Sequence, residues 1–441
     1  MKHSKTKRAD AKPGNATVAL PQIVQIEKPI YGGAFLARVE GKAIFVPLTL
    51  PGEQVRVRIL DEKRGYSVAD AEAILTASLE RIPSKCRHYG RCGGCHYQHA
   101  GYETQLAIKL AILRETFERG GIRMPVEIAV LSGDPWHYRN RIRLAFDSEG
   151  NPGYRGRRSH AVVQIDECPI AAPLLIEAAM AASQIARQFA AAWRPTEISL
   201  FCNRDETALL ASVFTSSKSK TPFDEFTLAL RKRIPSLVGS QLVSEDGEGS
   251  SRTLANWGAS SLAYRTNQFD YRVDQGAFFQ VNRWLVDELL EKVVFGRSGA
   301  LAWDLFAGVG LFARRLTENF ARVVAVESAP TAIAALQHNL QDTNGSGLNA
   351  ETVAFLRRHC KAERPDLIVL DPPRTGLGQE TTALLSEIAA PGVVYVSCDP
   401  ATLARDLRDL VGSGYRIESI TLVDLFPQTF HLETVVHLHR S

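Results

Sequence analysis

The sequence predicts an α/β fold that ends in a doubly wound, Rossmann-like domain and begins with an OB-like β-barrel. Three observations lead to this prediction. Short apolar strands alternate with helical stretches over residues 266–441, which is typical of a parallel sheet covered by helices. Residues 13–76 hold alternating apolar runs separated by glycine and proline turns. The chain of 441 residues is too long for one core, so we expect a mixed α+β central domain over 77–265.

The first twelve residues contain five lysines or arginines and no apolar stretch. We expect a disordered basic tail over 1–12 and no secretory signal. No segment is apolar over the length that a membrane span needs. We therefore expect a cytoplasmic protein that does not associate with membranes. The net charge of +4 is only weak support for a nucleic-acid partner.

The barrel prediction rests on alternation over 43–46 and 55–59 and on turns at 32–33 and 51–52. Small closed barrels of this kind often present basic residues to oligonucleotides. Residues 31–34, 45–47 and 51–53 resemble the corresponding segments of the TRAM domain, an RNA-binding module.

In the central region the pattern predicts helices over 102–119 and 171–193, with strands at 140–146, 197–202, 208–214 and 252–257. Segments 138–143 and 154–158 interleave arginines with aromatic residues. Such a surface can neutralise phosphates and stack on bases. The alternative is a solvated strand face without a ligand.

The seven cysteines are an odd number, which does not favour a secreted disulfide framework. Cys86, Cys92 and Cys95 lie within ten residues, and Cys168 follows far downstream. Four thiolates can hold zinc or a [4Fe–4S] cluster, and spacing barely separates the two. The proline after Cys168 favours iron–sulfur, as in ferredoxin-type sequences.

A glycine turn follows the strand predicted over 300–304, and the next strand, 322–327, ends in Glu327. Gly308 and Gly310 allow the backbone to approach a ligand at the carboxyl edge of the sheet, and Glu327 can accept from ribose hydroxyls. Asp304 opens the turn, and the full GxGxxG order of dinucleotide sites is missing. This arrangement resembles class I methyltransferases more than dehydrogenases, while a purely structural turn is the alternative.

Two residues near the carboxyl terminus offer covalent chemistry. Cys398 follows the strand at 392–397 and precedes a helix whose N-terminus would favour the thiolate. Glu433 opens an apolar strand. Methylation at C5 of a pyrimidine needs a thiolate that adds to C6 and a base that removes the C5 proton. A buried structural cysteine and a solvent-facing glutamate are the alternatives.

The loop after the strand at 367–371 begins with Asp371 and two prolines. This rigid loop can hold the Asp371 carboxylate toward uracil N3–H. Arg374 stands where an adenine N-methyltransferase would be expected to have an aromatic residue. The loop also lacks the second cysteine expected of an RNA 5-methylcytosine enzyme.

Taken together, residues 13–441 resemble the RNA 5-methyluridine methyltransferases, in the branch with a TRAM domain and a [4Fe–4S] cluster. The resemblance is carried by FFQVN (278–282), DLFAGVG (304–310), DPPRTGLG (371–378), YVSCDPATLARDL (395–407) and HLETVV (431–436). It implies a class I methyltransferase domain that uses S-adenosylmethionine. Cys398 is then the nucleophile and Glu433 the base, with cofactor and target contacts from a further set: Phe278 stacked on a flipped uracil, Gln280, Phe306, Gly308, Gly310, Glu327 and Asp371. The four clustered cysteines would hold [4Fe–4S], with zinc as the alternative.

Two positions depart from the family pattern. Leu311 stands where some members have asparagine after the glycine turn, which puts that cofactor contact in doubt. Asp399 replaces the more usual asparagine after the nucleophile, and we expect it to be tolerated.

Other functions remain open at this point. A non-catalytic RNA-binding or assembly factor is the main alternative, and the presence of Cys398 and Glu433 argues against it. Radical methylation is rejected because the cysteine spacing is longer than CxxxCxxC and a fourth cysteine is available. The resemblance favours 23S ribosomal RNA over the transfer RNA T-loop as substrate. We expect a monomer without an obligate protein partner.

Overall fold

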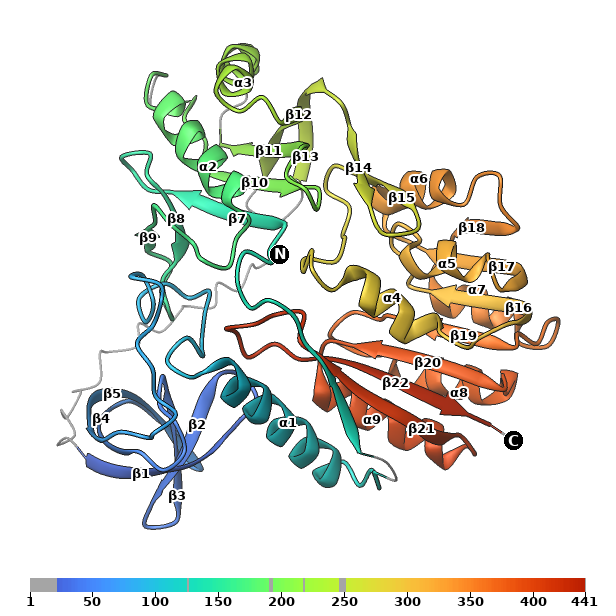
Figure 1. Ribbon diagram of the computed structural model, residues 1–441, viewed down its shortest axis with the longest axis horizontal. Helices are drawn as coiled ribbons and strands as arrows, with labels where there is room; N and C mark the ends of the chain where they lie inside the picture. The colour runs from blue at the N-terminus through green and yellow to red at the C-terminus, as the bar shows by residue number, and fades with distance from the viewer. Residues whose placement is uncertain (1–21, 125–126, 190–192, 217–218, 246–250, 441) are drawn as a thin grey trace, which may run out of the picture. The chain divides into compact units, whose positions relative to one another are not determined.

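The computed structural model describes the chain except residues 1–21, 125–126, 190–192, 217–218, 246–250 and 441 (Figure 1). The expected basic tail over 1–12 lies outside the described residues. The chain divides into two compact units, one of Met1–Ile30 with Ala34–Leu79, the other of Tyr31–Gly33 with Glu80–Ser441. Within the part of the chain that is described, no helix is long and apolar enough to cross a membrane.

The first unit contains a closed five-stranded barrel, as the alternation predicted. Its strands are β1 (Gln22–Pro29), β2 (Ala34–Val39), β3 (Lys42–Pro47), β4 (Gln54–Glu62) and β5 (Tyr66–Thr76), in the order β1-β2-β3-β5-β4. Along β1, Val24 and Ile26 are buried while Ile23 is exposed. This period of two places one face of each strand inside the barrel.

The second unit is built around an eight-stranded sheet in the order β18-β17-β16-β19-β20-β22-β21-β6. The strands are β16 (Gly299–Leu305), β17 (Phe320–Glu327), β18 (Gly345–Asn349), β19 (Leu367–Leu370), β20 (Gly392–Ser397), β21 (Arg416–Val423) and β22 (Glu433–His439). The strands predicted at 300–304, 322–327, 367–371 and 392–397 are present within two residues of their expected ends. The pairs from β18 to β20 are parallel, and β22 runs antiparallel to its neighbours β20 and β21.

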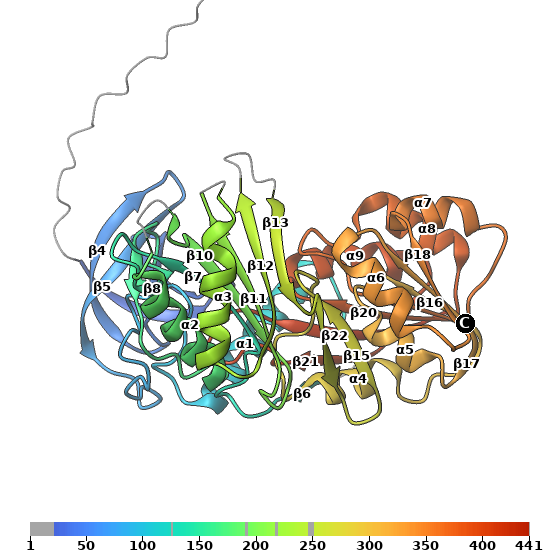
Figure 2. The ribbon, with the colours of Figure 1, turned by 90° about the horizontal axis from the view of Figure 1, so that it is seen from above.

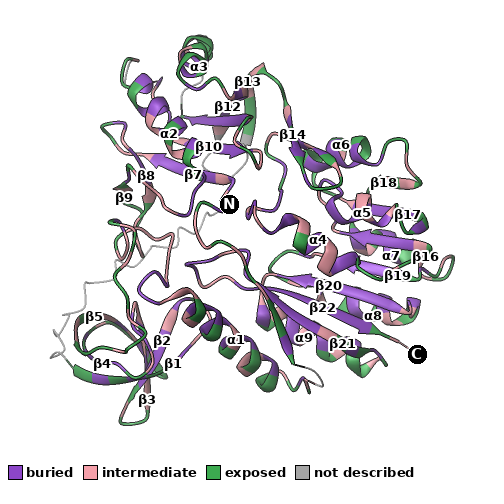
Figure 3. Cartoon of the chain, in the orientation of Figure 1, coloured by how far each residue is buried: buried purple, intermediate pink, exposed green. Residues whose placement is uncertain are grey.

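Helix α4 (Val286–Val294) precedes β16. The helices that connect strands of this sheet are α5 (Leu311–Leu316), α6 (Pro330–Asn339), α7 (Thr352–His359), α8 (Gly378–Ile388) and α9 (Pro400–Gly412). Every residue of β19 and β20 is buried (Figure 3). Parallel strands covered on both faces read as continuous apolar runs, which explains why the sequence identified them so clearly.

The eighth strand, β6 (Ile128–Leu131), pairs in parallel with β21 and comes from the region expected to form the central domain. The expected boundary at residue 266 therefore does not separate the strands of this sheet. Four residues are too short a signal to assign to one sheet from sequence alone, because only the exposed edge of β21 gives them a partner.

A seven-stranded sheet with the order β13-β12-β11-β10-β7-β8-β9 forms the rest of the central region. Its strands are β7 (Arg141–Phe146), β8 (Pro152–Arg155), β9 (Val162–Gln164), β10 (Glu197–Cys202), β11 (Leu209–Thr215), β12 (Leu237–Glu245) and β13 (Ser251–Gly258). A short hairpin of β14 (Ser261–Arg265) and β15 (Asp270–Asp274) follows.

Two helices, α2 (Pro173–Ala186) and α3 (Thr221–Arg233), pack on one face of the seven-stranded sheet (Figure 2). Proline at the first turn starts α2 at 173, later than the expected 171. Part of the expected extension to 193 lies outside the described residues. The helix predicted over 102–119 is α1 (Tyr102–Arg119), with the same bounds.

Candidate active site

The carboxyl ends of β16, β17, β19 and β20 surround a cavity of about 830 Å³. Ligands bind at this edge in open parallel sheets. The cavity brings together nearly all the side chains predicted for cofactor and target, and its lining includes Phe278, Gln280, Phe306, Gly308, Glu327, Asp371, Cys398 and Glu433. Gly310 does not line it.

The glycine turn after β16 has an unusual backbone. Phe306 has a positive φ of 66°, a conformation that non-glycine residues rarely adopt and that is often found at functional sites. Gly310 has φ of 87°, and a Cβ there would lie 2.7 Å from the Leu336 Cδ1 atom. Gly310 therefore acts through the shape of the turn. Leu311, the first residue of α5, is 6% exposed and contributes an apolar wall.

The Glu327 carboxylate is fixed by three backbone N–H groups. Gly308 N donates to Oε2 at 2.7 Å, and the N–H groups of Ser328 and Ala329 donate to Oε1 at 2.7 and 2.6 Å. These bonds tie the end of β17 to the glycine turn and hold the carboxylate at the cavity. An ionised carboxylate has about four acceptor positions, so it can still accept from a ligand hydroxyl.

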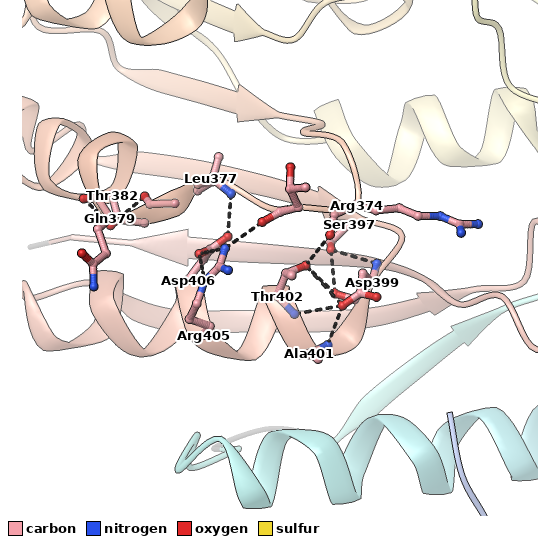
Figure 4. A network of polar contacts seen from close by, with 12 residues as sticks. Arg374, Leu377, Gln379, Thr382, Ser397, Asp399, Ala401, Thr402, Arg405 and Asp406 are labelled. Atoms are coloured by element: carbon pink, nitrogen blue, oxygen red, sulfur yellow. Dashed lines mark hydrogen bonds and ion pairs between the residues drawn. The ribbon is translucent and has the colours of Figure 1, made fainter. Parts of the chain in front are cut away.

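Cys398 lies at the end of β20, where it is half-buried, and α9 begins two residues later. Asp399 caps that helix, because its Oδ1 accepts from the N–H groups of Ala401 and Thr402 at 3.0 and 2.9 Å (Figure 4). Aspartate and asparagine are both preferred N-caps, so the capping role is kept with aspartate at this position. The Tyr31 hydroxyl donates to the Cys398 carbonyl oxygen at 3.3 Å.

Burial and the nearby Glu433 and Asp371 raise the pKa of the Cys398 thiol, Arg374 opposes them, and the result is a pKa of about 12. Desolvation of the charged thiolate is the largest cause of this shift. The thiol is protonated at neutral pH, and forming the thiolate requires transfer of its proton.

Burial favours the neutral form of two of the acidic side chains that line the cavity, Glu433 and Asp371. Glu433 is 5% exposed, and burial followed by the charge of Asp371 raises its pKa well above the usual value. Burial raises the pKa of Asp371 to about 7. Two buried carboxyls in one cavity disfavour simultaneous ionisation, which is a common way to prepare an acid and a base.

The loop over 371–378 is fastened to α9 by buried polar contacts (Figure 4). Asp406 Oδ2 accepts from Leu377 N at 2.7 Å and from the Tyr395 hydroxyl at 2.8 Å. The Thr402 hydroxyl donates to the Arg374 carbonyl oxygen at 3.2 Å. The motifs at 371–378 and 395–407 thus form one structural unit that sets the position of Arg374.

The segment 424–430, which leads to His431 and β22, was not identified from sequence, although Phe426 lines the cavity together with His431. Helix α1 holds this segment. Lys109 Nζ donates to Asp424 Oδ1 at 2.6 Å, and both side chains are fully buried. The sequence did contain a signal, because Lys109 lies among apolar residues on the buried face of α1.

Gln428 forms a second link to α1. Gln105 Nε2 donates to Gln428 Oε1 at 2.9 Å, and Gln428 N donates to Gln105 Oε1 at 2.9 Å. The backbone N–H groups of His96 and Tyr97 donate to the Gln428 carbonyl oxygen at 2.8 and 3.0 Å. The segment that leads to Glu433 is therefore joined to the chain directly after Cys95.

A second pocket is lined by all four predicted ligand cysteines, Cys86, Cys92, Cys95 and Cys168, together with Arg139. Burial raises the pKa of each of these thiols, to about 11 for Cys92 and about 12 for Cys95. Gly94 N donates to Cys92 Sγ at 3.4 Å. Four buried thiols are a donor set that suits an iron–sulfur cluster or zinc. In the described ranges, no three His, Cys, Asp or Glu side chains are placed closely enough to hold a metal ion as they stand.

The open face of the seven-stranded sheet carries arginines over aromatic rings, but the rings are those of Phe201 and Phe214 from β10 and β11. Tyr138, which the interleaved pattern placed on such a surface, is buried, and its neighbour Arg139 lines the cysteine pocket. The Arg141 guanidinium lies 4.3 Å from the Phe201 ring centre, and that of Arg143 lies 4.1 Å from the Phe214 ring centre. These side chains line a hollow of about 370 Å³. The hollow borders the cavity, because Gly276 and Thr331 line both.

The fold places the chain among class I S-adenosylmethionine-dependent methyltransferases. The structure of a tRNA (uracil-54, C5)-methyltransferase from Pyrococcus abyssi, solved with S-adenosyl-L-homocysteine, matches with a TM-score of 0.76 and 23% identity. The match covers 94% of this chain and 100% of that one.

Sequence comparison narrows this class to one family. Family models described as TRAM domain and tRNA (Uracil-5-)-methyltransferase match residues 22–71 and 359–441. An uncharacterized RNA methyltransferase of Thermotoga maritima is 31% identical over 94% of this chain and 98% of its own length. The 23S rRNA (uracil(1939)-C(5))-methyltransferase RlmD of Pseudomonas fluorescens is 31% identical over the full length of both chains. This chain belongs to the family of RNA uracil-C5 methyltransferases.

Proposed function

We propose that this protein methylates C5 of a uridine in structured RNA with S-adenosylmethionine as the methyl donor. The observation that carries the proposal is that one half-buried thiol, Cys398, and one buried carboxyl, Glu433, line the same cavity as the glycine turn and Glu327. A cofactor site alone would fit many methyltransferases. The addition of a thiol and a base is what C5 of uracil requires.

In the proposed reaction the Cys398 thiol gives its proton to solvent, its sulfur bonds to C6, and the C5=C6 electron pair moves onto C5 and O4. C5 then bonds to the methyl group, whose bond to the donor sulfur breaks. The Glu433 carboxylate takes the C5 proton, the C5=C6 bond forms again, and the bond between C6 and Cys398 breaks. Each bond formed is matched by one broken, and the thiolate is regenerated.

The remaining cavity residues have roles in binding and orientation. Phe278 is 62% exposed at the cavity, and we assign it to stacking on the target base. Such access requires the uridine to leave the RNA stack. Asp371 accepts from uracil N3–H, and Gln280, Phe306 and Glu327 contact the cofactor in this proposal.

We favour 23S ribosomal RNA as the substrate. The relatives that carry a 23S rRNA name are 30–32% identical and span nearly the whole chain, whereas the transfer RNA enzyme of known structure is 23% identical. We assign RNA contacts to Arg141 and Arg143 in the second unit and, independently, to the TRAM domain in the first. The T-loop of transfer RNA is the second substrate class to be tested.

We also propose that Cys86, Cys92, Cys95 and Cys168 hold a [4Fe–4S] cluster, with zinc as the alternative. Support comes from the four thiols of one pocket and from the N–H bond to Cys92. The proposed methyl transfer involves no electron transfer, so we assign the cluster to structure. Iron, sulfide and zinc analysis of anaerobically purified protein separates the two metals.

The first experiment is nucleoside mass spectrometry after incubation with S-adenosylmethionine. Unmodified 23S rRNA and tRNA transcripts are used in separate reactions, and Cys398→Ala is the control. We expect 5-methyluridine in the rRNA reaction and none with the variant. Product in the tRNA reaction alone would overturn the substrate assignment.

The alternative of a non-catalytic RNA-binding factor makes a different prediction. That protein would bind RNA and S-adenosylhomocysteine but form no 5-methyluridine on either transcript, with or without Cys398. Calorimetric titration of S-adenosylhomocysteine, run alongside, shows that the protein used is competent to bind its cofactor.

A further inference from the structure

The cavity contains a histidine that the reaction described above does not use. His431 lines the cavity together with Cys398, Asp371 and Glu433. Its Nδ1 atom lies 3.2 Å from an Nη atom of Arg374. The His431 ring also packs against the rings of Phe426 and Phe430, with centroid distances of 5.5 and 4.3 Å. These two contacts restrain the orientation of the imidazole.

The contact with Arg374 determines which ring nitrogen carries the proton. A guanidinium can only donate, so Nδ1 of His431 must be the acceptor. Burial, together with the charge of Arg374, lowers the pKa of His431 to about 3, and the ring is therefore neutral. A neutral imidazole with Nδ1 as acceptor has its single proton on Nε2.

The neutral ring with its proton on Nε2 can donate a hydrogen bond but is not suited to act as the base. A histidine with so low a pKa is a weak base at neutral pH, which leaves proton removal to Glu433. Its Nε2–H is nevertheless a good donor, because the positive charge of Arg374 on Nδ1 polarises the ring. Arg374 itself is held in place from the other side by the bond from Thr402 to its carbonyl oxygen (Figure 4).

The reaction needs a donor of this kind. When the Cys398 sulfur bonds to C6, negative charge develops on O4 of the uracil, next to the N3–H that we assign to Asp371. A donor positioned for the developing charge lowers the barrier more than one that binds the neutral base. We propose that His431 Nε2–H donates to uracil O4 and stabilises the enolate, with Arg374 as a positioning residue that fixes the tautomer. This inference rests on the proposed function.

Two substitutions of similar size test the inference. In His431→Gln the side-chain amide nitrogen can occupy the place of Nε2, whereas in His431→Asn it reaches only the place of Nδ1. We expect His431→Asn to lower kcat by about 10²–10³-fold, the usual loss for one such donor. The RNA KM should change less than about threefold, because the interaction strengthens only in the transition state. His431→Gln should recover most of the lost rate.

The measurements are single-turnover formation of 5-methyluridine and release of tritium from C5-labelled RNA, at saturating S-adenosylmethionine. Melting temperature and S-adenosylhomocysteine affinity are recorded for each variant, because a merely structural role would change them in both. Equal losses in the two variants, or wild-type rates in both, would overturn the assignment of His431. If wild-type protein forms no 5-methyluridine on any transcript, the proposed function itself has failed, and this inference fails with it.

Discussion

The protein has two buried thiol sites that resemble each other in electrostatics and differ in their neighbours. In both, burial raises the pKa of the thiol, to about 12 for Cys398 and about 12 for Cys95. In both, one arginine partly opposes this effect, Arg374 in the first and Arg139 in the second. The shift in pKa alone therefore does not distinguish a nucleophile from a metal ligand.

The neighbours do distinguish them. Cys398 is the only cysteine among the described residues that line its cavity of about 830 Å³, and the lining also includes the carboxyls of Asp371 and Glu433. The second pocket gathers four cysteines. A lone protonated thiol beside potential bases can be activated when a substrate arrives. Four thiols together lose their protons to a metal, whose binding free energy then stabilises the fold.

The largest effect is expected when one cysteine of each site is replaced by alanine and the two variants are compared. Cys398→Ala should abolish 5-methyluridine formation, by at least about 10⁴-fold, because no other group can form the bond to C6. Its metal content should remain that of the wild type. Cys92→Ala should instead lose bound iron and keep S-adenosylhomocysteine binding. Rapid assays, elemental analysis and calorimetry on both variants measure the contrast, and loss of iron from Cys398→Ala would contradict it.

The next largest effect concerns Glu433. With Glu433→Gln the C5 proton cannot be removed, so turnover should fall by about 10³-fold, within the usual range for a general base. The reaction should stop after methylation, with RNA bonded to Cys398. A denaturing gel detects this adduct, and the double variant with Cys398→Ala should show none. Normal turnover of Glu433→Gln would remove it as the base.

The features of the fold and the site that could be predicted from the sequence are those set by residues close together in the chain. The glycine turn, Glu327 and Cys398 each follow an apolar strand, and the carboxyl ends of parallel strands meet at one edge, so their convergence was predictable. Helix α1 was predicted with its observed bounds because its apolar period is long.

The contacts that the sequence did not reveal join distant segments. Lys109 and Asp424 are 315 residues apart, and no local sequence pattern predicts that they pair. The same holds for β6, whose four residues join a sheet far along the chain. His431 lay within a recognised motif, but its role depends on Arg374, 57 residues away.

A third prediction concerns the buried ion pair of Lys109 and Asp424, which holds the segment leading to Glu433 against helix α1. Lys109→Met leaves Asp424 buried without its partner, and this should lower the free energy of unfolding by about 3–5 kcal/mol. Because both charges are fully buried, Lys109→Met with Asp424→Leu should recover much of the loss. Urea unfolding measures both variants. If the double variant regains stability but not kcat, the pair also positions the segment that leads to Glu433.

The smallest effect is expected at the surface of the catalytic cavity. Phe278→Leu keeps an apolar side chain but removes the ring on which the target base would stack, a contact that contributes about 1–3 kcal/mol in single-stranded nucleic-acid recognition. Since Phe278 is 62% exposed, the protein should keep its melting temperature. The loss should appear in the rate with RNA and leave S-adenosylhomocysteine affinity unchanged, because the ring serves the base and not the cofactor. A variant that loses affinity for S-adenosylhomocysteine while retaining its rate with RNA would show instead that Phe278 belongs to the cofactor site. The cavity would then have to hold the uracil by the edge contacts of Asp371 and His431 alone.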